Sequence, residues 1–110
     1  VELLKRVISY IHQNYQRQLT LGELSALAGM NEQYFCRFFK KALGKTPISY
    51  INDYRIHHAA TLLSTTELPV MGECLESGFN NLGHFMKEFK KATQLTPLQF
   101  RKQTMTKSFK

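Results

Sequence analysis

Apolar side chains recur every three or four residues along most of the chain, with polar side chains between them. The first such series is Leu3, Leu4, Val7, Ile8, Ile11 and Tyr15. This period is that of an α-helix with one buried face. No stretch alternates apolar and polar residues as a half-buried β-strand would. The pattern therefore predicts an all-α fold of about seven helices.

Capping residues mark where several of these helices begin and end. Thr20 and Glu23 form a capping box, in which each side chain bonds to the other residue's backbone N–H, and Gly29 is placed to end that helix. Proline is tolerated at the first helical position because its missing N–H would have no partner there. The later helices are expected to start at Asn31, at Thr46-Pro47, at Pro69, at Asn80 or Asn81, and at Thr96-Pro97.

The chain contains an internal repeat with an offset of 50 residues. Residues 35–42 (FCRFFKKA) recur as residues 85–92 (FMKEFKKA), and Thr46-Pro47 recurs as Thr96-Pro97. Each copy consists of a short helix, a glycine-containing turn and a longer basic helix, which is the helix-turn-helix arrangement. We therefore expect one domain over residues 1–103, with a first helix-turn-helix over about 19–45, a linker helix over about 47–63, a second helix-turn-helix over about 69–93, and a flexible basic tail over 104–110.

The charge of the chain suggests a polyanionic partner. Lys and Arg number 15 and Asp and Glu number 8 among 110 residues, a net charge of +7. No apolar run approaches the roughly 20 residues needed to span a bilayer, and no signal peptide opens the chain. Cys36 and Cys74 both fall within helical patterns, so we expect reduced thiols and a cytoplasmic location. Because an amphipathic pattern starts directly at Val1, we expect the chain to be a fragment of a longer protein.

A specific combination of residues resembles the signature of the AraC/XylS family of bacterial transcription regulators. Its elements, in order, are Gly78-Phe79-Asn80-Asn81, Phe85, Phe89-Lys90-Lys91, Thr96-Pro97 and Phe100-Arg101. The resemblance covers nearly all of residues 1–103. It implies sequence-specific binding of double-stranded DNA by two helix-turn-helix units, whose second helices enter adjacent major grooves. It also implies that many members are activators that touch RNA polymerase, with an effector-binding or dimerisation domain elsewhere, here expected N-terminal to this chain.

The first basic helix has a polar face opposite its phenylalanines. That face carries Gln33, Cys36, Arg37 and Lys40, spaced i, i+3, i+4 and i+7. Arg37 can form two parallel hydrogen bonds with guanine, and Gln33 can form two with adenine. Lys40 lies nearer the edge of the groove, where phosphate contact is expected. The same positions resemble those that contact bases in the family.

The second basic helix has a chemically poorer face. The repeat places Gly83, Met86, Lys87 and Lys90 where the first copy has its polar face. Gly83 has no side chain to contact a base, and Lys87 can reach guanine only as a point donor without the planar fork of arginine. Met86 can offer only apolar contact, for example to a thymine methyl. Asn81 and His84 are the remaining polar candidates, as helix caps or as phosphate contacts. We therefore expect the first half of a DNA site to be specified more strictly than the second.

Two residues depart from the family pattern. Glu73 stands where the first copy has the apolar Leu24. A lone buried carboxylate is costly, so Glu73 is expected either to be paired or to lie at the surface. Gln94 replaces the glycine that ends the first basic helix, Gly44.

Two other functional classes compete with DNA binding. A basic helical protein-interaction module with an acidic partner would explain the charge but not the repeated Lys-Lys pairs. An enzyme is not expected, because the chain shows no convincing nucleophile, metal set or phosphate loop, and no cofactor is implied. His57 and His58 are adjacent on a helix and point about 100° apart, so they cannot chelate one metal ion.

Overall fold

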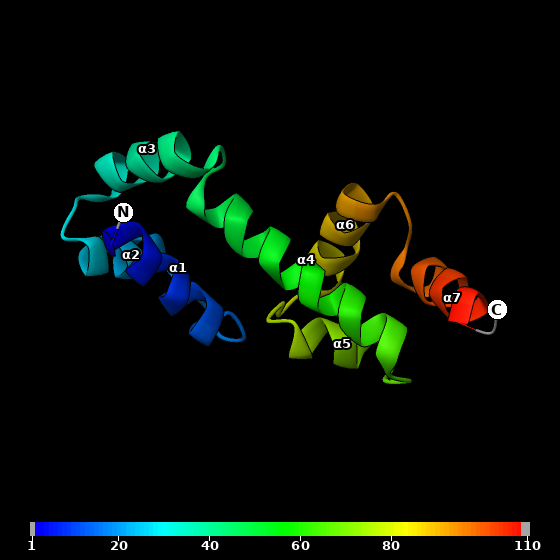
Figure 1. The fold of residues 1–110 in the computed structure, drawn as a ribbon. Coiled ribbons are helices and arrows are strands. Elements are labelled where there is room, and N and C mark those ends of the chain that lie inside the picture. The colour runs from blue at the N-terminus through cyan, green and yellow to red at the C-terminus, as the bar shows by residue number, and fades with distance from the viewer. Residues whose placement is uncertain (1, 109–110) are drawn as a thin grey trace. The chain divides into compact units, whose positions relative to one another are not determined.

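The computed structural model describes residues 2–108 and contains seven helices (Figure 1). Their bounds are α1 Glu2–Asn14, α2 Leu21–Ala28, α3 Glu32–Leu43, α4 Pro47–Thr65, α5 Val70–Glu76, α6 Leu82–Thr93 and α7 Pro97–Ser108. No β-strand occurs between residues 2 and 108. The all-α prediction is thus confirmed.

The chain divides into two compact units at a point within α4. The first unit, residues 1–54, contains α1, α2, α3 and the N-terminal part of α4. The second unit, residues 55–110, contains the remainder of α4 together with α5, α6 and α7. Each unit therefore has its own helix-turn-helix pair, α2–α3 or α5–α6.

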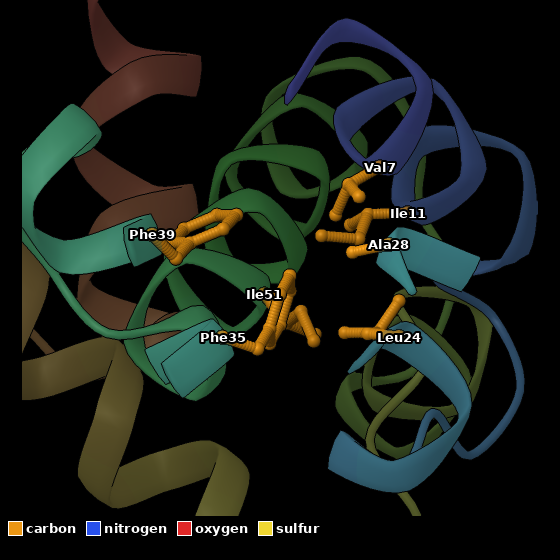
Figure 2. Packing of buried hydrophobic residues seen from close by; sticks show 7 residues of the cluster. All are labelled: Val7, Ile11, Leu24, Ala28, Phe35, Phe39 and Ile51. Carbon is orange, nitrogen blue, oxygen red and sulfur yellow. The ribbon is translucent and has the colours of Figure 1, made fainter. Parts of the chain in front are cut away.

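The core of the first unit collects side chains from four helices (Figure 2). Its buried members are Val7 and Ile11 of α1, Leu24 and Ala28 of α2, Phe35 and Phe39 of α3, and Ile51 of α4. Each helix that contributes two of them places the pair one turn apart, which is the spacing that puts side chains on one face. Full burial of such side chains stabilises by roughly 1.5–3 kcal/mol each.

The second unit repeats this core with a different composition. Phe85 and Phe89 of α6 are fully buried, and Phe100 of α7 packs edge-on against Phe89 with ring centroids 5.4 Å apart. The other buried members are Ile56, Ala59 and Leu63 of α4, Cys74 of α5, and Phe79. Aromatic rings thus provide much of the apolar contact in this unit.

The repeat is visible in burial as well as in sequence. Residues 31–50 and 81–100 have the same helix boundaries, and their burial classes agree at 18 of 20 aligned positions. The two differences fall at 45/95 and 46/96, in the turn after each basic helix. The two copies therefore present equivalent faces to solvent.

Three apolar residues that continue the helical period are exposed. Ala42 and Ala92, in the last turns of the basic helices, are exposed, and Ile48 at the start of α4 is 47% exposed. All three lie in the first or last turn of a helix, so the apolar period there does not correspond to burial. Phe38 is half-buried against the first core.

The predicted caps are present at the helix starts. Thr20 and Glu23 form the capping box, and Asn31 accepts a hydrogen bond from the Tyr34 amide at 2.8 Å. Hydrogen bonds from the Arg17 guanidinium and the Tyr10 hydroxyl lower the pKa of Glu23 to about 2. Because this pKa is depressed, the contribution to stability is present above the ordinary carboxyl pKa and is lost as the pH falls toward 2.

The last helix extends beyond the expected end of the domain. α7 continues through Ser108, whereas a flexible tail was expected from residue 104. Residues 109–110 of that tail lie outside the described residues. The linker helix likewise ends at Thr65 rather than near residue 63.

A buried ion pair connects α5 and α7 in the second unit. The Glu73 side chain is fully buried and pairs with Arg101, whose side chain is 15% exposed. The Thr66 hydroxyl also donates to Glu73 Oε1 at 3.0 Å, and Arg101 Nε donates to the Leu63 carbonyl at 3.2 Å. Of the two outcomes expected for Glu73, pairing and a surface position, the structure shows pairing. Its second oxygen, Oε2, and the hydroxyl of Ser77 are buried without a hydrogen-bond partner.

Removing Arg101 should destabilise the second unit more than removing the whole ion pair. Arg101→Met leaves a buried carboxylate uncompensated and should lower the free energy of unfolding by about 3–5 kcal/mol. The double variant Arg101→Met/Glu73→Leu, which restores the leucine found at the equivalent position of the first unit, should recover most of this loss. Urea unfolding measures both, with Lys102→Met as the matched control on the exposed side of α7. Equal effects of Arg101→Met and Lys102→Met would contradict this assignment.

Gln94 adopts a backbone conformation that favours glycine. Its φ is 68°, in the left-handed region, where Gly44 has φ 80° in the first unit. Since this region costs a non-glycine residue roughly 1–2 kcal/mol, Gln94→Gly should raise stability by about 1 kcal/mol. The reciprocal change Gly44→Gln should lower it similarly, because no atom lies within 4 Å of a Cβ added there and only strain remains. Thermal unfolding of the two variants should shift in opposite directions.

Candidate nucleic-acid interface

The outward face of α3 carries the residues predicted to contact DNA in the first unit. Gln33, Arg37 and Lys40 are exposed, and Cys36 is half-buried. The opposite face is held by the fully buried Phe35 and Phe39, whose ring centroids are 5.8 Å apart. The Asn31 cap and the left-handed Gly44 define both ends of α3. These constraints set the rotation and the length of the helix, so its polar face is directed to solvent.

The outward face of α6 has the same geometry and different chemistry. Gly83, Lys87 and Lys90 are exposed, while Met86 is half-buried and packs against the core of the second unit. Phe85 and Phe89 anchor the inward face with ring centroids again 5.8 Å apart. In each unit, the predicted site residues named above therefore lie on one face of the basic helix.

Asn81 and His84 take different places at the start of α6. Asn81 is the helix cap, since its Oδ1 accepts the His84 backbone amide at 2.9 Å, which settles the choice between Asn80 and Asn81. The His84 ring lies edge-on to Phe79 with centroids 5.5 Å apart, and its Nε2 is 3.9 Å from Glu88 Oε2. His84 keeps 47% of its side chain exposed. The His84 ring is therefore accessible to a binding partner at the surface, next to the Glu88 carboxylate.

Gly83 marks the clearest difference between the two faces. A Cβ added at Gly83 would lie 3.2 Å from Asn81 Oδ1, so the cap would have to move by a few tenths of an ångström. In the first unit, Gln33 occupies the equivalent position two residues after the Asn31 cap. The same fold thus accommodates a side chain here, and the second unit omits it.

Two exposed residues beside these faces were not among the predicted site residues. Tyr34 is 52% exposed and Leu82 is 38% exposed, both within the first turn of a basic helix. For Leu82, the repeat offered a signal in the sequence, because its equivalent in the first unit is the charged Glu32.

Cys74 and the adjacent histidines His57 and His58 lie on other helices than the two outward faces. Cys74 is buried and its thiol donates to the Phe79 carbonyl at 3.7 Å, and this burial raises the pKa of the Cys74 thiol. The rings of His57 and His58 are nearly perpendicular, with centroids 6.4 Å apart. Among the residues that the structure describes, no three His, Cys, Asp or Glu side chains are grouped to hold a metal ion. None of the helices within residues 2–108 combines the length and apolarity needed to cross a membrane.

The chemistry of the two faces fits a polyanion with hydrogen-bonding groups between its charges. Lys40 and Lys41 lie in the last turn of α3, and Lys90 and Lys91 lie in the last turn of α6, all exposed. Lysine at these positions can neutralise phosphates, while the residues nearer the helix start can reach base edges. The arrangement can therefore both hold and distinguish a nucleic acid.

Comparison with known proteins identifies this arrangement independently. A family model described as a helix-turn-helix domain matches residues 24–103. The HTH-type transcriptional regulator YdeC of Bacillus subtilis is 33% identical over 99 residues, which are 90% of this chain and 34% of YdeC. The chain thus spans about a third of the length of that relative.

Two solved structures share the fold. A probable AraC family transcriptional regulator from Rhodopseudomonas palustris superposes with a TM-score of 0.83 at 27% identity, covering 94% of this chain and 98% of that one. The DNA-binding domain of the transcriptional factor AdpA, crystallised with a target DNA, has a TM-score of 0.90 at 22% identity and covers 94% of each chain. The comparison with AdpA, at 22% identity, establishes a shared fold alone.

Proposed function

Because the chain belongs to the AraC-type helix-turn-helix family of transcription regulators, we propose that it binds double-stranded DNA sequence-specifically through α3 and α6. The observation that carries this proposal is the duplicated basic helix. Both copies bury the same phenylalanine pair and expose equivalent positions, and both have two exposed lysines in the last turn. A protein-interaction module with an acidic partner would not require this second copy.

In the first unit, Gln33 and Arg37 are the residues that recognise bases. Both side chains are exposed and lie one turn apart on α3, near its N-terminal half. Their planar groups can each form two hydrogen bonds with one base, adenine for glutamine and guanine for arginine. Cys36, half-buried beside them, lies within the same contact area, and Lys40 contacts phosphate.

In the second unit, phosphate contacts contribute more than base contacts. Lys87 and Lys90 are exposed point charges on α6, and His84 can donate to a phosphate from the first turn. Asn81 supports the helix start, and Gly83 lets the backbone approach the groove. The two helices are proposed to enter adjacent major grooves on one face of the DNA, as the family resemblance implies.

The proposed role is recognition and positioning, without a catalytic step or a cofactor. The family consists of transcription regulators, and DNA binding requires only the surfaces described above. A cytoplasmic location follows from this role. Since the chain spans 34% of YdeC, we propose that an effector-binding or dimerisation domain precedes it in the full-length protein.

A separate surface on α5 is proposed to contact RNA polymerase. Met71 and Leu75 lie one turn apart on α5 and are 49% and 57% exposed. The equivalent positions of the first unit, at the offset of 49 residues that applies to this helix, are the small residues Gly22 and Ala26. Exposed carboxylates at Glu67 and Glu76 flank the pair, in a chain of net charge +7. An apolar and acidic surface repels DNA and suits a protein partner with basic residues.

Salt titration separates DNA binding from the protein-interaction alternative. Affinity for a random duplex should fall steeply with salt because binding releases counterions. Lys40→Gln/Lys90→Gln should weaken binding to all duplexes by similar factors and reduce the salt slope by about one unit per lost contact. Lys5→Gln on α1 is the matched exposed control. Absence of duplex binding at low salt would refute the proposed function.

Arg37→Ala should impair recognition without affecting folding. The loss of a bidentate contact should cost roughly 1–3 kcal/mol on the preferred site and relax preference at one base pair. Thermal unfolding should be unchanged, because Arg37 lies on the exposed face. Binding to single-base variants of a site selected from a random pool measures the first effect. A loss of stability with unchanged affinity would show that α3 does not face the DNA as proposed.

Shortening the α5 side chains should separate polymerase contact from DNA contact. Met71→Ala/Leu75→Ala should leave affinity for the selected site unchanged and should lower cooperative binding of RNA polymerase to a promoter carrying that site. Leu98→Ala, which changes another exposed leucine of the second unit, should affect neither. Unchanged cooperativity in the α5 variant would contradict the proposed contact.

A further inference from the structure

Two apolar side chains occupy the part of α6 that is equivalent to the base-contacting part of α3. Leu82 is the first residue of α6, and Met86 follows one turn later on the same side of the helix. In the first unit these positions hold Glu32 and Cys36. The backbone and burial pattern are otherwise the same, so the difference lies in the chemistry of the exposed face.

Leu82 lies at the surface of its unit. It is 38% exposed, in the first turn of α6. Met86 is half-buried, with part of its side chain against that core and part at the surface. Leu82 and part of Met86 therefore form an apolar surface on α6, and covering that surface in a complex would be favourable.

The surroundings of these side chains favour a partner deep in the groove. Gly83, next to Leu82, has no side chain to hold a partner away from the helix, and Lys87 and Lys90 are exposed farther along it. The first residues of a recognition helix are those that contact base edges in helix-turn-helix proteins. Leu82 and Met86 therefore lie in the part of α6 where base edges are expected, and Lys90, the equivalent of Lys40, lies where a phosphate is expected.

The major groove offers one apolar group at base edges, the C5 methyl of thymine. Resting on the proposed DNA binding, we propose that Leu82 and Met86 are specificity-determining residues that recognise thymine methyl groups. The half-site bound by α6 is then selected by apolar contact, whereas the half-site bound by α3 is selected by the hydrogen bonds of Gln33 and Arg37. This gives the chemically poorer helix a defined preference for A·T pairs at the positions facing its start.

Replacing thymine by deoxyuridine tests this inference, because the replacement removes the methyl group and keeps every hydrogen-bonding group. The probe is a duplex selected by this chain from a random pool, with each thymine replaced in turn. The half-site bound by α3 is identified as the half in which Arg37→Ala relaxes base preference. One or more replacements in the other half should weaken binding about threefold to fivefold, the loss expected for one buried methyl group.

Two leucine variants test whether the weaker binding of the deoxyuridine duplexes depends on Leu82. Leu82→Ala should bind the thymine and deoxyuridine duplexes with nearly equal affinity, whereas Leu98→Ala should keep the full difference. Both leucines are exposed, so both variants should unfold at the same temperature as the parent chain. Met86→Ala provides a second variant with the same expectation for binding, although it should unfold at a lower temperature because Met86 packs against the second core.

Three results would overturn the inference while leaving the proposed function intact. The first is a selected site without thymine in the half bound by α6. The second is unchanged affinity for every deoxyuridine duplex, and the third is undiminished methyl dependence in both Leu82→Ala and Met86→Ala. Failure to select or bind any duplex would instead refute the proposed DNA binding itself.

Discussion

The orientation of each basic helix depends on one pair of phenylalanines a turn apart. Phe35 and Phe39 in α3, and Phe85 and Phe89 in α6, are all fully buried, and both pairs have ring centroids 5.8 Å apart. A helix anchored by two large rings on one side cannot rotate without exposing them, at roughly 1.5–3 kcal/mol per ring. The polar or basic face on the other side is therefore directed to solvent, and the candidate interface follows from this burial.

The two units share a backbone framework but differ in where their polar and apolar side chains lie. The first unit combines an apolar core around Leu24 with an outward face on α3 that can form bidentate hydrogen bonds. In the second unit, Glu73 occupies the core position of Leu24 and forms an ion pair with Arg101. The outward face of α6 contains apolar side chains and point charges. Because the phenylalanine pair sets the backbone in both copies, the surrounding positions were free to change their chemistry without changing the fold.

The buried carboxylate of the second unit is compensated locally at one of its two oxygens. The carboxylate of Glu73 is balanced by Arg101 and by the hydroxyl of Thr66, and Arg101 is in turn fixed by the Leu63 carbonyl. These contacts join α5, α7 and the C-terminal end of α4 with directional bonds where the first unit has apolar contact. Gln94, in its left-handed conformation, accepts strain at a turn in which the other copy has glycine.

Sequence by itself determined the elements of this protein, because helix periods, caps and stops are local properties of the chain. The capping box at Thr20 and Glu23, the Asn31 cap and the repeat of the basic helix were all predictable, and with them the division into two helix-turn-helix units. Tertiary structure alone decided which apolar residues are covered: Ala42, Ala92 and Ile48 continue the apolar period but are exposed. It also decided that Glu73 is buried and paired with Arg101, 28 residues away. Burial and pairing depend on which distant segments pack together, and no local pattern in the chain specifies them.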